Sequence, residues 1–287
     1  MTRSSILFIA AFTAVTYTAC NDQPAKETDT TETKPDSTQQ EAAPQPAIKE
    51  ETVSYTGDGV TMKGFVAYDS ANTAKRPAVL IVHEWWGLND YPKMRARELA
   101  KLGYVAFAMD MFGDGKTVDN PDAAGKIATP FYKNPQKAKA RIDAALATLK
   151  SMSQTDTSKI AAIGYCFGGG MVLNAAKLGE NVNGVVSFHG MLAGVPPKKE
   201  LLKAKILVCH GAADQFVKQP EVDQFKKQMD SVGADYTFKA YPDAGHAFSN
   251  PNSTNVGKQF NIPIAYNAAA DSASWKDMKS FFDRIFK

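Results

Sequence analysis

The fold of this chain follows from the stretch Gly164-Tyr165-Cys166-Phe167-Gly168-Gly169-Gly170. The apolar run from Ile160 to Ile163 comes directly before it and predicts a buried strand, and an apolar, helix-like segment comes after it. Glycines two positions before and two positions after Cys166 relieve the crowding that side chains would cause in a sharp strand-to-helix turn. We therefore expect the Cys166 sulfur at the carboxyl edge of a sheet.

Such a turn makes Cys166 a candidate nucleophile. The backbone amide of Phe167 would lie at a helix N-terminus, where it can stabilise a thiolate and donate a hydrogen bond to an oxyanion. A plainer interpretation is a glycine-rich turn with an inert cysteine, because free cysteine is among the most buried residue types. A phosphate cradle is disfavoured, since the stretch lacks Gly-x-Gly-x-x-Gly and a P-loop lysine. The turn alone leaves the first two interpretations open.

Two more residues follow Cys166 in an informative order. Asp214 lies in a short loop after the expected strand 204–208, and His246 lies in a loop after the expected strand 235–241. The order nucleophile, acid, histidine is that of α/β-hydrolases and differs from the orders in chymotrypsin and subtilisin. We expect His246 to accept the Cys166 proton and Asp214 to hold the imidazole in the required tautomer.

The apolar stretch 77–82 predicts a buried parallel strand, and His83-Glu84-Trp85 follow it. The loop after this strand supplies the second amide of an oxyanion hole, which we assign to Trp85, beside the amide of Phe167. His83-Glu84 also resembles the start of a zinc-protease helix. However, no second histidine follows at the required spacing, and no ligand spacing links the four histidines of the chain. We therefore expect no metal and no cofactor.

Taken together, these features resemble the dienelactone hydrolase family over roughly residues 50 to 287. The likeness rests on Glu84 after His83, on the Gly-Tyr-Cys-Phe-Gly turn, on Asp214 and on the Gly-His-Ala-Phe stretch around His246. The resemblance implies a triad of Cys166, His246 and Asp214. It also implies that Glu84 contacts the resting thiol and takes part in forming the thiolate when substrate binds. The implied activity is hydrolysis of carboxylic esters or lactones through a thioester acyl-enzyme.

The alternation of strands and helices predicts an α/β-hydrolase three-layer sandwich with a mostly parallel central sheet. A hairpin near 53–68 opens the domain. We expect strands at 77–82, 104–109, 159–165, 184–189, 205–210 and 235–241, and helices at 92–102, 135–151, 168–178, 220–231 and 271–286.

Two long stretches, 111–134 and 247–270, are expected to be irregular and to shape a pocket above the carboxyl edge. The candidate pocket residues in them are Phe112, Asp114, Phe248 and Asn250. Asp114 and Asn250 match positions where lactone-cleaving members of the family carry arginines that hold a substrate carboxylate. Without those bidentate partners an anionic substrate loses affinity, so we expect esters or lactones in general, with neutral ones preferred.

Residues 1–19 are expected to form a signal peptide. Their start is weakly positive, and the apolar stretch 6–15 is too short to span a bilayer. Thr18-Ala19-Cys20 resembles a bacterial lipoprotein processing site, although Tyr17 departs from the usual aliphatic residue. We expect Cys20 to be lipidated, in an exported bacterial protein that is periplasmic or anchored to a membrane by this lipid alone. Ordinary signal cleavage is the alternative.

Residues 20–52 are rich in Thr, Glu, Gln, Pro and Ala, and predict a disordered tether that cannot bury enough apolar surface to fold. Residues 53–287 have the length of one catalytic domain. Its only cysteines are Cys166 and Cys209, and Cys209 is expected to be a core residue because it lies in a predicted buried strand.

The composition sets limits on partners. The chain has 287 residues, a formal net charge of +3 and 44% hydrophobic residues, which suffices for a sizeable core. Its lysines are dispersed and form no basic cluster with interleaved aromatic residues, so we expect no nucleic-acid partner. A small-molecule ester or lactone is the expected partner. The competing hypothesis is a non-catalytic, surface-anchored binding protein on the same fold, which the complete set of candidate catalytic residues disfavours.

Overall fold

The computed structural model of this chain describes residues 45–287, which form one unit. The expected signal peptide and most of the expected tether lie outside the described residues. Within residues 45–287, no helix combines the length and the apolar character that a membrane crossing needs.

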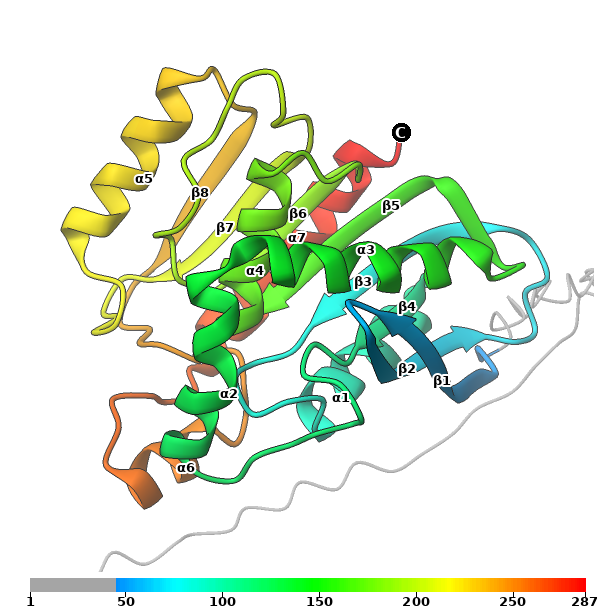
Figure 1. The fold of residues 1–287 in the computed structure, drawn as a ribbon, viewed down its shortest axis with the longest axis horizontal. Helices are drawn as coiled ribbons and strands as arrows, with labels where there is room; N and C mark the ends of the chain where they lie inside the picture. Colours follow the sequence, from blue (N-terminus) through cyan, green and yellow to red (C-terminus); the bar gives the residue numbers. More distant parts are fainter. Residues whose placement is uncertain (1–44) are drawn as a thin grey trace, which may run out of the picture. The chain divides into compact units, whose positions relative to one another are not determined.

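An eight-stranded sheet is the frame of the domain (Figure 1). Its strands are β1 (Ile48–Gly57), β2 (Val60–Asp69), β3 (Arg76–Val82), β4 (Val105–Met109), β5 (Thr155–Tyr165), β6 (Gly184–Phe188), β7 (Lys205–Gly211) and β8 (Tyr236–Tyr241). They are arranged in the order β1-β2-β4-β3-β5-β6-β7-β8. The strands from β3 to β8 run parallel, and the β1-β2 hairpin joins β4 in antiparallel pairing. The loops after the parallel strands therefore meet at one edge.

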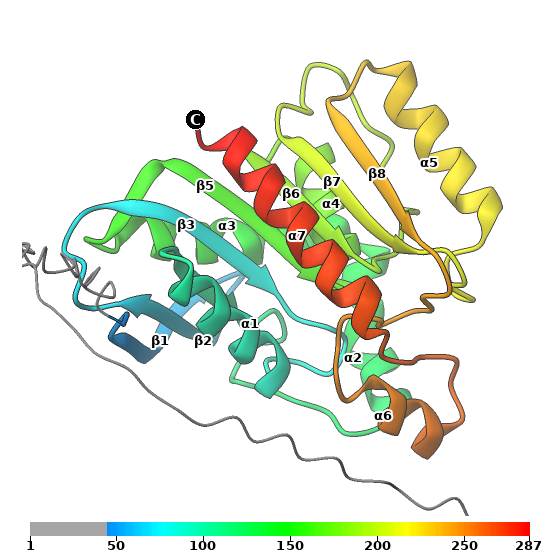
Figure 2. The ribbon, with the colours of Figure 1, turned by 180° about the vertical axis from the view of Figure 1, so that it is seen from behind.

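Helices cover both faces of the sheet (Figures 1 and 2). Helices α1 (Asp90–Lys101) and α7 (Ala268–Ile285) lie on one face, and α3 (Pro135–Ser151), α4 (Phe167–Lys177) and α5 (Gln219–Ser231) lie on the other. Successive residues of β3 alternate between the two cores: Leu80 and Val82 pack on the α4 side, and Val79 and Ile81 on the α7 side. Burial on both faces explains the continuous apolar runs, and the predicted three-layer architecture is confirmed.

The domain begins earlier than predicted. Strand β1 starts at Ile48, and its pairing with β2 runs from Ile48 opposite Asp69 to Gly57 opposite Val60. Residues 48–52, which we assigned to the tether, are therefore part of a strand. Their side chains are mostly polar and only partly covered, so their composition resembles a tether, whereas backbone pairing with β2 orders them.

Two helices lie in the stretches that we expected to be irregular, namely α2 (Pro121–Lys133) and α6 (Ser253–Phe260). Helix α2 contains Gly125 and Pro130, and both residue types disfavour a helix interior. The Asn120 side chain caps its first turn, and a buried face packs it onto the domain, so tertiary contacts override the propensities. Helix α6 has only eight residues, too few for a periodic pattern to be recognised.

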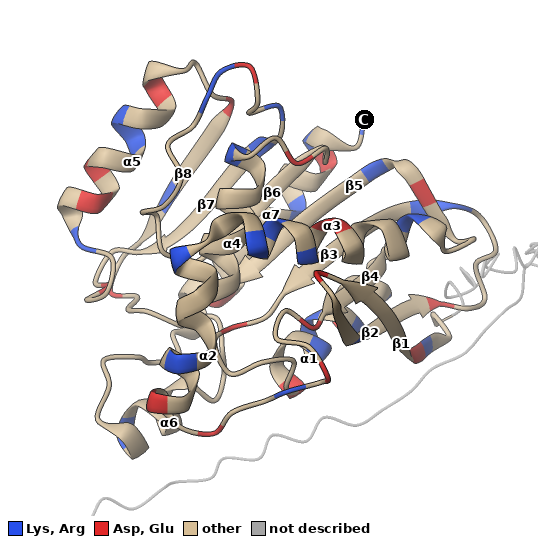
Figure 3. Cartoon of the chain, viewed as in Figure 1, with Lys and Arg blue, Asp and Glu red and all other residues tan. Residues whose placement is uncertain are grey.

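Charged residues of both signs are spread over the helices and loops of the domain (Figure 3). Several of them pair across elements, for example Arg97 with Glu50 and Lys137 with Asp58. Such partly exposed pairs contribute little to stability. The two apolar cores therefore supply most of the free energy of folding.

Candidate active site

Cys166 is the single residue between β5 and α4. Its backbone angles are φ 51° and ψ −114°, and a positive φ is uncommon for residues other than glycine. A Cβ atom at Gly168 would lie 2.2 Å from the carbonyl oxygen of Val82, and one at Gly164 would lie 2.1 Å from that of Gly168. Only glycines at these two positions let the elbow turn, residues 164–168, close against the sheet.

The structure brings together the three residues that the chain order singled out. Cys166 Sγ lies 3.0 Å from His246 Nε2, and His246 Nδ1 lies 2.8 Å from Asp214 Oδ2. Asp214 Oδ1 accepts hydrogen bonds from the backbone amides of Phe216 and Val217, which fix the carboxylate. The fixed carboxylate in turn orients the imidazole toward the sulfur.

The electrostatics of this group favour a protonated His246. Burial lowers the pKa of His246, but the Cys166 sulfur and the Asp214 carboxylate outweigh burial and raise this pKa to about 10. Burial also raises the pKa of Asp214, but the bond and charge of His246 hold it below its usual value. His246 is therefore protonated at neutral pH, between a carboxylate and a sulfur. A cationic neighbour of this kind stabilises a thiolate.

Two backbone amides lie where an oxyanion hole is expected. The Phe167 amide is the first of α4, so it has no acceptor within the helix. The Trp85 amide lies in the turn after β3, and no acceptor for it is found among the described residues. Both amides lie at the carboxyl edge of the sheet, one in a turn and one at a helix N-terminus, and neither is used within the described backbone, so both can donate to an oxygen beside Cys166.

A hollow with a cavity volume of about 90 Å³ opens over Cys166 and His246. Most of its other walls are apolar or aromatic, and no lysine or arginine contributes to its lining in the part of the chain that the structure describes. Its lining residues are Glu84, Trp85, Trp86, Tyr132, Cys166, Met191, Phe216, His246, Ala247 and Ile264. An uncharged, apolar group fits such walls without losing hydrogen bonds to water.

A family model of dienelactone hydrolases matches residues 62–286. The chain belongs to the dienelactone hydrolase family. Membership supports a hydrolase of the ester or lactone type, and it agrees with the α/β-hydrolase fold described above.

Individual relatives cover nearly the whole domain of this family member. Protein usf of Aquifex pyrophilus is 32% identical over 221 residues, which are 75% of this chain and 94% of that protein. A provisionally named carboxymethylenebutenolidase of Aquifex aeolicus is 31% identical over 243 residues, which are 82% of this chain and 98% of that protein. The crystal structure of a dienelactone hydrolase-like promiscuous phosphotriesterase from metagenomic libraries is 32% identical with a TM-score of 0.77, and the match covers 83% of this chain and 98% of that one.

Glu84, which the family resemblance places against the resting thiol, is bonded differently here. Its Oε2 atom accepts a hydrogen bond of 2.7 Å from Asn250 Nδ2, while the thiol pairs with His246. Glu84 is nearly fully buried, and burial raises its pKa to about 7 against the opposing effects of Asn250 and His246. The carboxyl group thus lines the same hollow as Cys166 but is held by an amide.

None of the four predicted pocket residues lines the hollow. Phe112 and Phe248 are buried in the two cores, on opposite sides of the sheet. Asn250 acts on the hollow only through Glu84. Asp114 is exposed, and its side chain lies near Lys116.

The position of Asp114 has a local cause. After β4, the Asp110 carboxylate accepts hydrogen bonds from the amides of Phe112, Gly113 and Gly115, so the chain wraps tightly around it. This turn directs Asp114 to the surface, where no substrate carboxylate in the hollow would meet it.

Sequence reasoning missed Phe216 and Met191, which line the hollow, whereas Tyr132 lies in the stretch 111–134 that we expected to shape the pocket. Tyr132 lies in the last turn of α2, Phe216 follows β7, and Met191 follows β6. Tyr132 and Phe216 remain 43% and 41% exposed, as large apolar side chains at the rim of a pocket. No pattern along the chain marks them, because three separate segments bring them together.

His83, considered above as part of a zinc motif, has a structural role. Its Nε2 atom accepts from the Met111 amide at 3.1 Å, and Nδ1 lies 2.5 Å from the carbonyl oxygen of Glu84, so Nδ1 carries the proton. Burial lowers its pKa to about 4. Over residues 45–287, no group of three or more histidine, cysteine or acidic side chains is arranged to hold a metal ion.

Proposed function

We propose that this protein hydrolyses neutral carboxylic esters or lactones through a thioester on Cys166. The observation that carries the proposal is the continuous chain from Cys166 Sγ to His246 to Asp214, with bonds of 3.0 and 2.8 Å, at the base of an apolar hollow. Membership of the dienelactone hydrolase family supports the same reaction type.

In the first half-reaction, the Cys166 thiolate attacks the carbonyl carbon of the ester. The carbonyl oxygen becomes an oxyanion and accepts hydrogen bonds from the amides of Trp85 and Phe167. When the tetrahedral intermediate collapses, the carbon–oxygen bond to the leaving group breaks and His246 Nε2 gives its proton to the departing alkoxide. The products are an alcohol and a thioester.

In the second half-reaction, the neutral His246 accepts a proton from water, and the resulting hydroxide attacks the thioester carbon. The same two amides hold the second oxyanion. Collapse breaks the carbon–sulfur bond, which releases the acid and restores the thiolate beside a protonated His246. Asp214 stabilises each imidazolium that forms and keeps Nδ1 protonated.

The proposed preference for neutral substrates follows from the lining of the hollow. Glu84 is the only acidic residue in the lining, and lysine and arginine are missing from it over the described residues. A substrate carboxylate would lose hydration and gain no cationic partner other than His246, which the reaction already uses. We propose that Glu84, held by Asn250, adds repulsion against such substrates and that His246 alone maintains the thiolate.

Neutral phosphotriesters are a second candidate class. The relative from metagenomic libraries carries promiscuous phosphotriesterase activity in its name and is 32% identical over most of this domain. A phosphotriester is uncharged, and its P=O oxygen can accept from the same two amides. Comparing an aryl dialkyl phosphate with the matching aryl carboxylate shows which class is turned over faster.

A trapped intermediate tests the proposal. Incubation with an activated aryl ester should add the acyl mass to the peptide that contains Cys166, and peptide mass spectrometry locates the adduct. Cys209→Ala is the matched control, because Cys209 is fully buried in β7 and should leave the adduct unchanged. If the aryl ester is not cleaved and Cys166 stays unmodified, the result would instead support the non-catalytic binding protein.

A further inference from the structure

The nucleophile's own backbone amide has a side-chain partner. The Cys166 amide donates to the carbonyl oxygen of Phe188 at 3.0 Å and to His189 Nδ1 at 3.1 Å. His189 directly follows β6, is fully buried and has a positive φ of 41°. A hydrogen bond thus joins two residues that both have a positive φ, Cys166 and His189.

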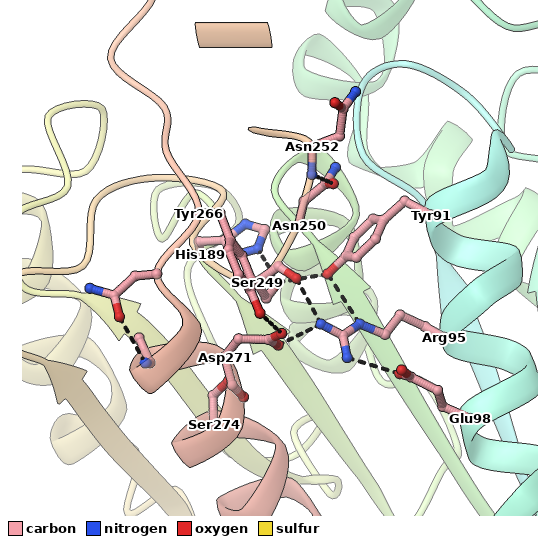
Figure 4. Close-up of polar contacts among 12 residues, drawn as sticks. Tyr91, Arg95, Glu98, His189, Ser249, Asn250, Asn252, Tyr266, Asp271 and Ser274 are labelled. Atoms are coloured by element: carbon pink, nitrogen blue, oxygen red, sulfur yellow. Dashed lines mark hydrogen bonds and ion pairs between the residues drawn. The ribbon is translucent and has the colours of Figure 1, made fainter. Parts of the chain in front are cut away.

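The hydrogen bonds determine the tautomer of His189. Because Nδ1 accepts from Cys166, the ring proton is on Nε2, which lies 2.7 Å from Ser249 Oγ and donates to it. Ser249 Oγ also lies 2.7 Å from the hydroxyl of Tyr91. Figure 4 shows this line of side chains running from the sheet edge to α1.

Arg95 holds the far end of this line. Its Nε donates to the Tyr91 hydroxyl at 3.4 Å, and its Nη2 donates to the Ser249 carbonyl oxygen at 2.7 Å and pairs with Asp271 of α7 (Figure 4). Arg95 is 4% exposed. The His189 network, meaning His189, Ser249, Tyr91 and Arg95, is therefore buried and connected at every step.

The surroundings keep His189 neutral. Its pKa lies well below the usual value, because the site is buried and because His246 and Arg95 are both cationic neighbours. The ring centroids of His189 and His246 are 5.5 Å apart. Protonation of His189 would also put a proton on Nδ1, so the Cys166 amide would lose this acceptor.

The inference rests on the function proposed above. We propose that His189 is a positioning residue, whose fixed neutral tautomer holds the Cys166 amide and so aligns the sulfur with the Phe167 amide. Ser249 lies three residues after His246 in the chain. The network thereby also couples the loop that carries His246 to the elbow turn. His189 touches neither substrate nor sulfur in this role.

The tautomer can be observed without substrate. In the ¹⁵N-labelled protein at neutral pH, side-chain NMR of His189 should show a protonated Nε2 and an unprotonated Nδ1. The His189→Asn variant identifies the signal by its loss. A His189 signal from the Nδ1-H tautomer, or from a doubly protonated ring, would overturn the proposal.

Kinetics of a matched pair test the consequence. Asparagine and leucine have similar shapes, but only asparagine offers an acceptor near the position of Nδ1. We expect His189→Leu to lower kcat for a neutral aryl ester by about tenfold to a hundredfold with KM nearly unchanged, since misplacement by about 1 Å can cost that much. His189→Asn should recover most of the loss. Equal kcat values for the two variants would contradict the proposed role.

A control and a second readout separate the two proposals. His210 is also a buried histidine at a strand end, but its Nδ1 has no hydrogen-bond partner among the described residues, so His210→Gln should leave kcat within about twofold. If the acyl adduct on Cys166 never forms, the proposed function fails. If the adduct forms and His189→Leu retains full kcat, only the positioning role fails. Should His189→Leu not fold, the NMR measurement on the unmodified protein still decides.

Discussion

At Cys166 the backbone stores strain that its neighbours offset. A positive φ at a residue with a side chain costs free energy, and such positions persist only where the surroundings determine them strongly. Here the glycines of the elbow turn remove clashes, and two acceptors satisfy the Cys166 amide. The outcome is a partly buried side chain whose sulfur contacts His246. This is the physical basis for assigning chemistry to one cysteine and packing to the other.

Removing that sulfur gives the first prediction. Cys166→Ala should lower esterase kcat by at least about a hundredfold while the protein stays folded, because members of a triad act as a unit. The measurement is turnover of an activated aryl ester, with circular dichroism as the check on folding. Turnover near that of the unmodified protein would remove Cys166 from the mechanism.

The raised pKa of His246 gives a prediction about pH. The pKa of His246 is raised to about 10 from its usual 6.5, so the imidazolium persists as pH rises through neutrality and is lost only near pH 10. We therefore expect side-chain NMR of His246 in the ¹⁵N-labelled protein to show protons on both ring nitrogens from about pH 7 to pH 9. Loss of either ring proton within that range would show that Cys166 and Asp214 do not hold His246 as an imidazolium.

Charge selection at the hollow gives a third prediction. We expect kcat/KM for a neutral short-chain ester to exceed that for its carboxylate-bearing analogue by at least about tenfold, since an unpaired buried charge is costly. Glu84→Gln should reduce this ratio of kcat/KM values, because it removes the negative charge that repels the substrate carboxylate and keeps a hydrogen-bond partner for Asn250. A preference of the unmodified enzyme for the anionic ester would mean that an unrecognised cation binds the carboxylate.

At the scale of elements, the contact of α4 with the end of β3 sets the position of Cys166 at the carboxyl edge of the sheet. Gly168 lies so close to the end of β3 that an added Cβ atom would be 2.2 Å from the carbonyl oxygen of Val82 and 2.7 Å from that of His83. Those carbonyls belong to the sheet edge and cannot retreat without breaking it. The position of α4 therefore depends on the absence of a single methyl group.

A pair of glycine variants tests this contact. Gly168→Ala should lower the free energy of unfolding by about 1–3 kcal/mol, the usual cost of overpacking. Gly125→Ala is the control: a Cβ there meets nothing within 4 Å, and the change in the interior of α2 should stabilise by about 0.5–1 kcal/mol. Urea titrations compare the two. Equal effects of the two changes would show that the close approach does not govern stability.

At the scale of the whole molecule, the described domain accounts for residues 45–287, and the expected export leader and Cys20 lie outside it. We propose that the chain is exported and held at a membrane by lipid on Cys20. A single acyl chain binds membranes only marginally, so stable attachment requires the several chains of a lipoprotein. The domain would then act on substrates that reach it outside the cytoplasm.

Mass spectrometry of the protein from its native host tests this proposal. We expect the mature chain to begin at a Cys20 that carries acyl chains, and Cys20→Ala to release the protein from the membrane fraction. The esterase activity of the released variant should be unchanged, because Cys20 lies outside the domain. A mature N-terminus at another residue would rule out the lipid anchor.

Much of this protein was determined by the sequence alone, for reasons that are local. Continuous apolar runs predict strands buried on both faces, and the loops after parallel strands must meet at one edge. The chain order of Cys166, Asp214 and His246 was therefore enough to place them together. Cys209 is fully buried, as its position in an apolar run predicted.

Tertiary structure alone decided the rest. Asn250 reaches Glu84 across 166 positions of the chain, and Tyr91 reaches Ser249 across 158. No local pattern encodes such contacts, because they depend on how helices and loops from distant segments pack against the sheet. The same reason explains why Phe216 and Met191 line the hollow without any signal in the sequence. Chain order determined which groups can react, and packing decided what surrounds them.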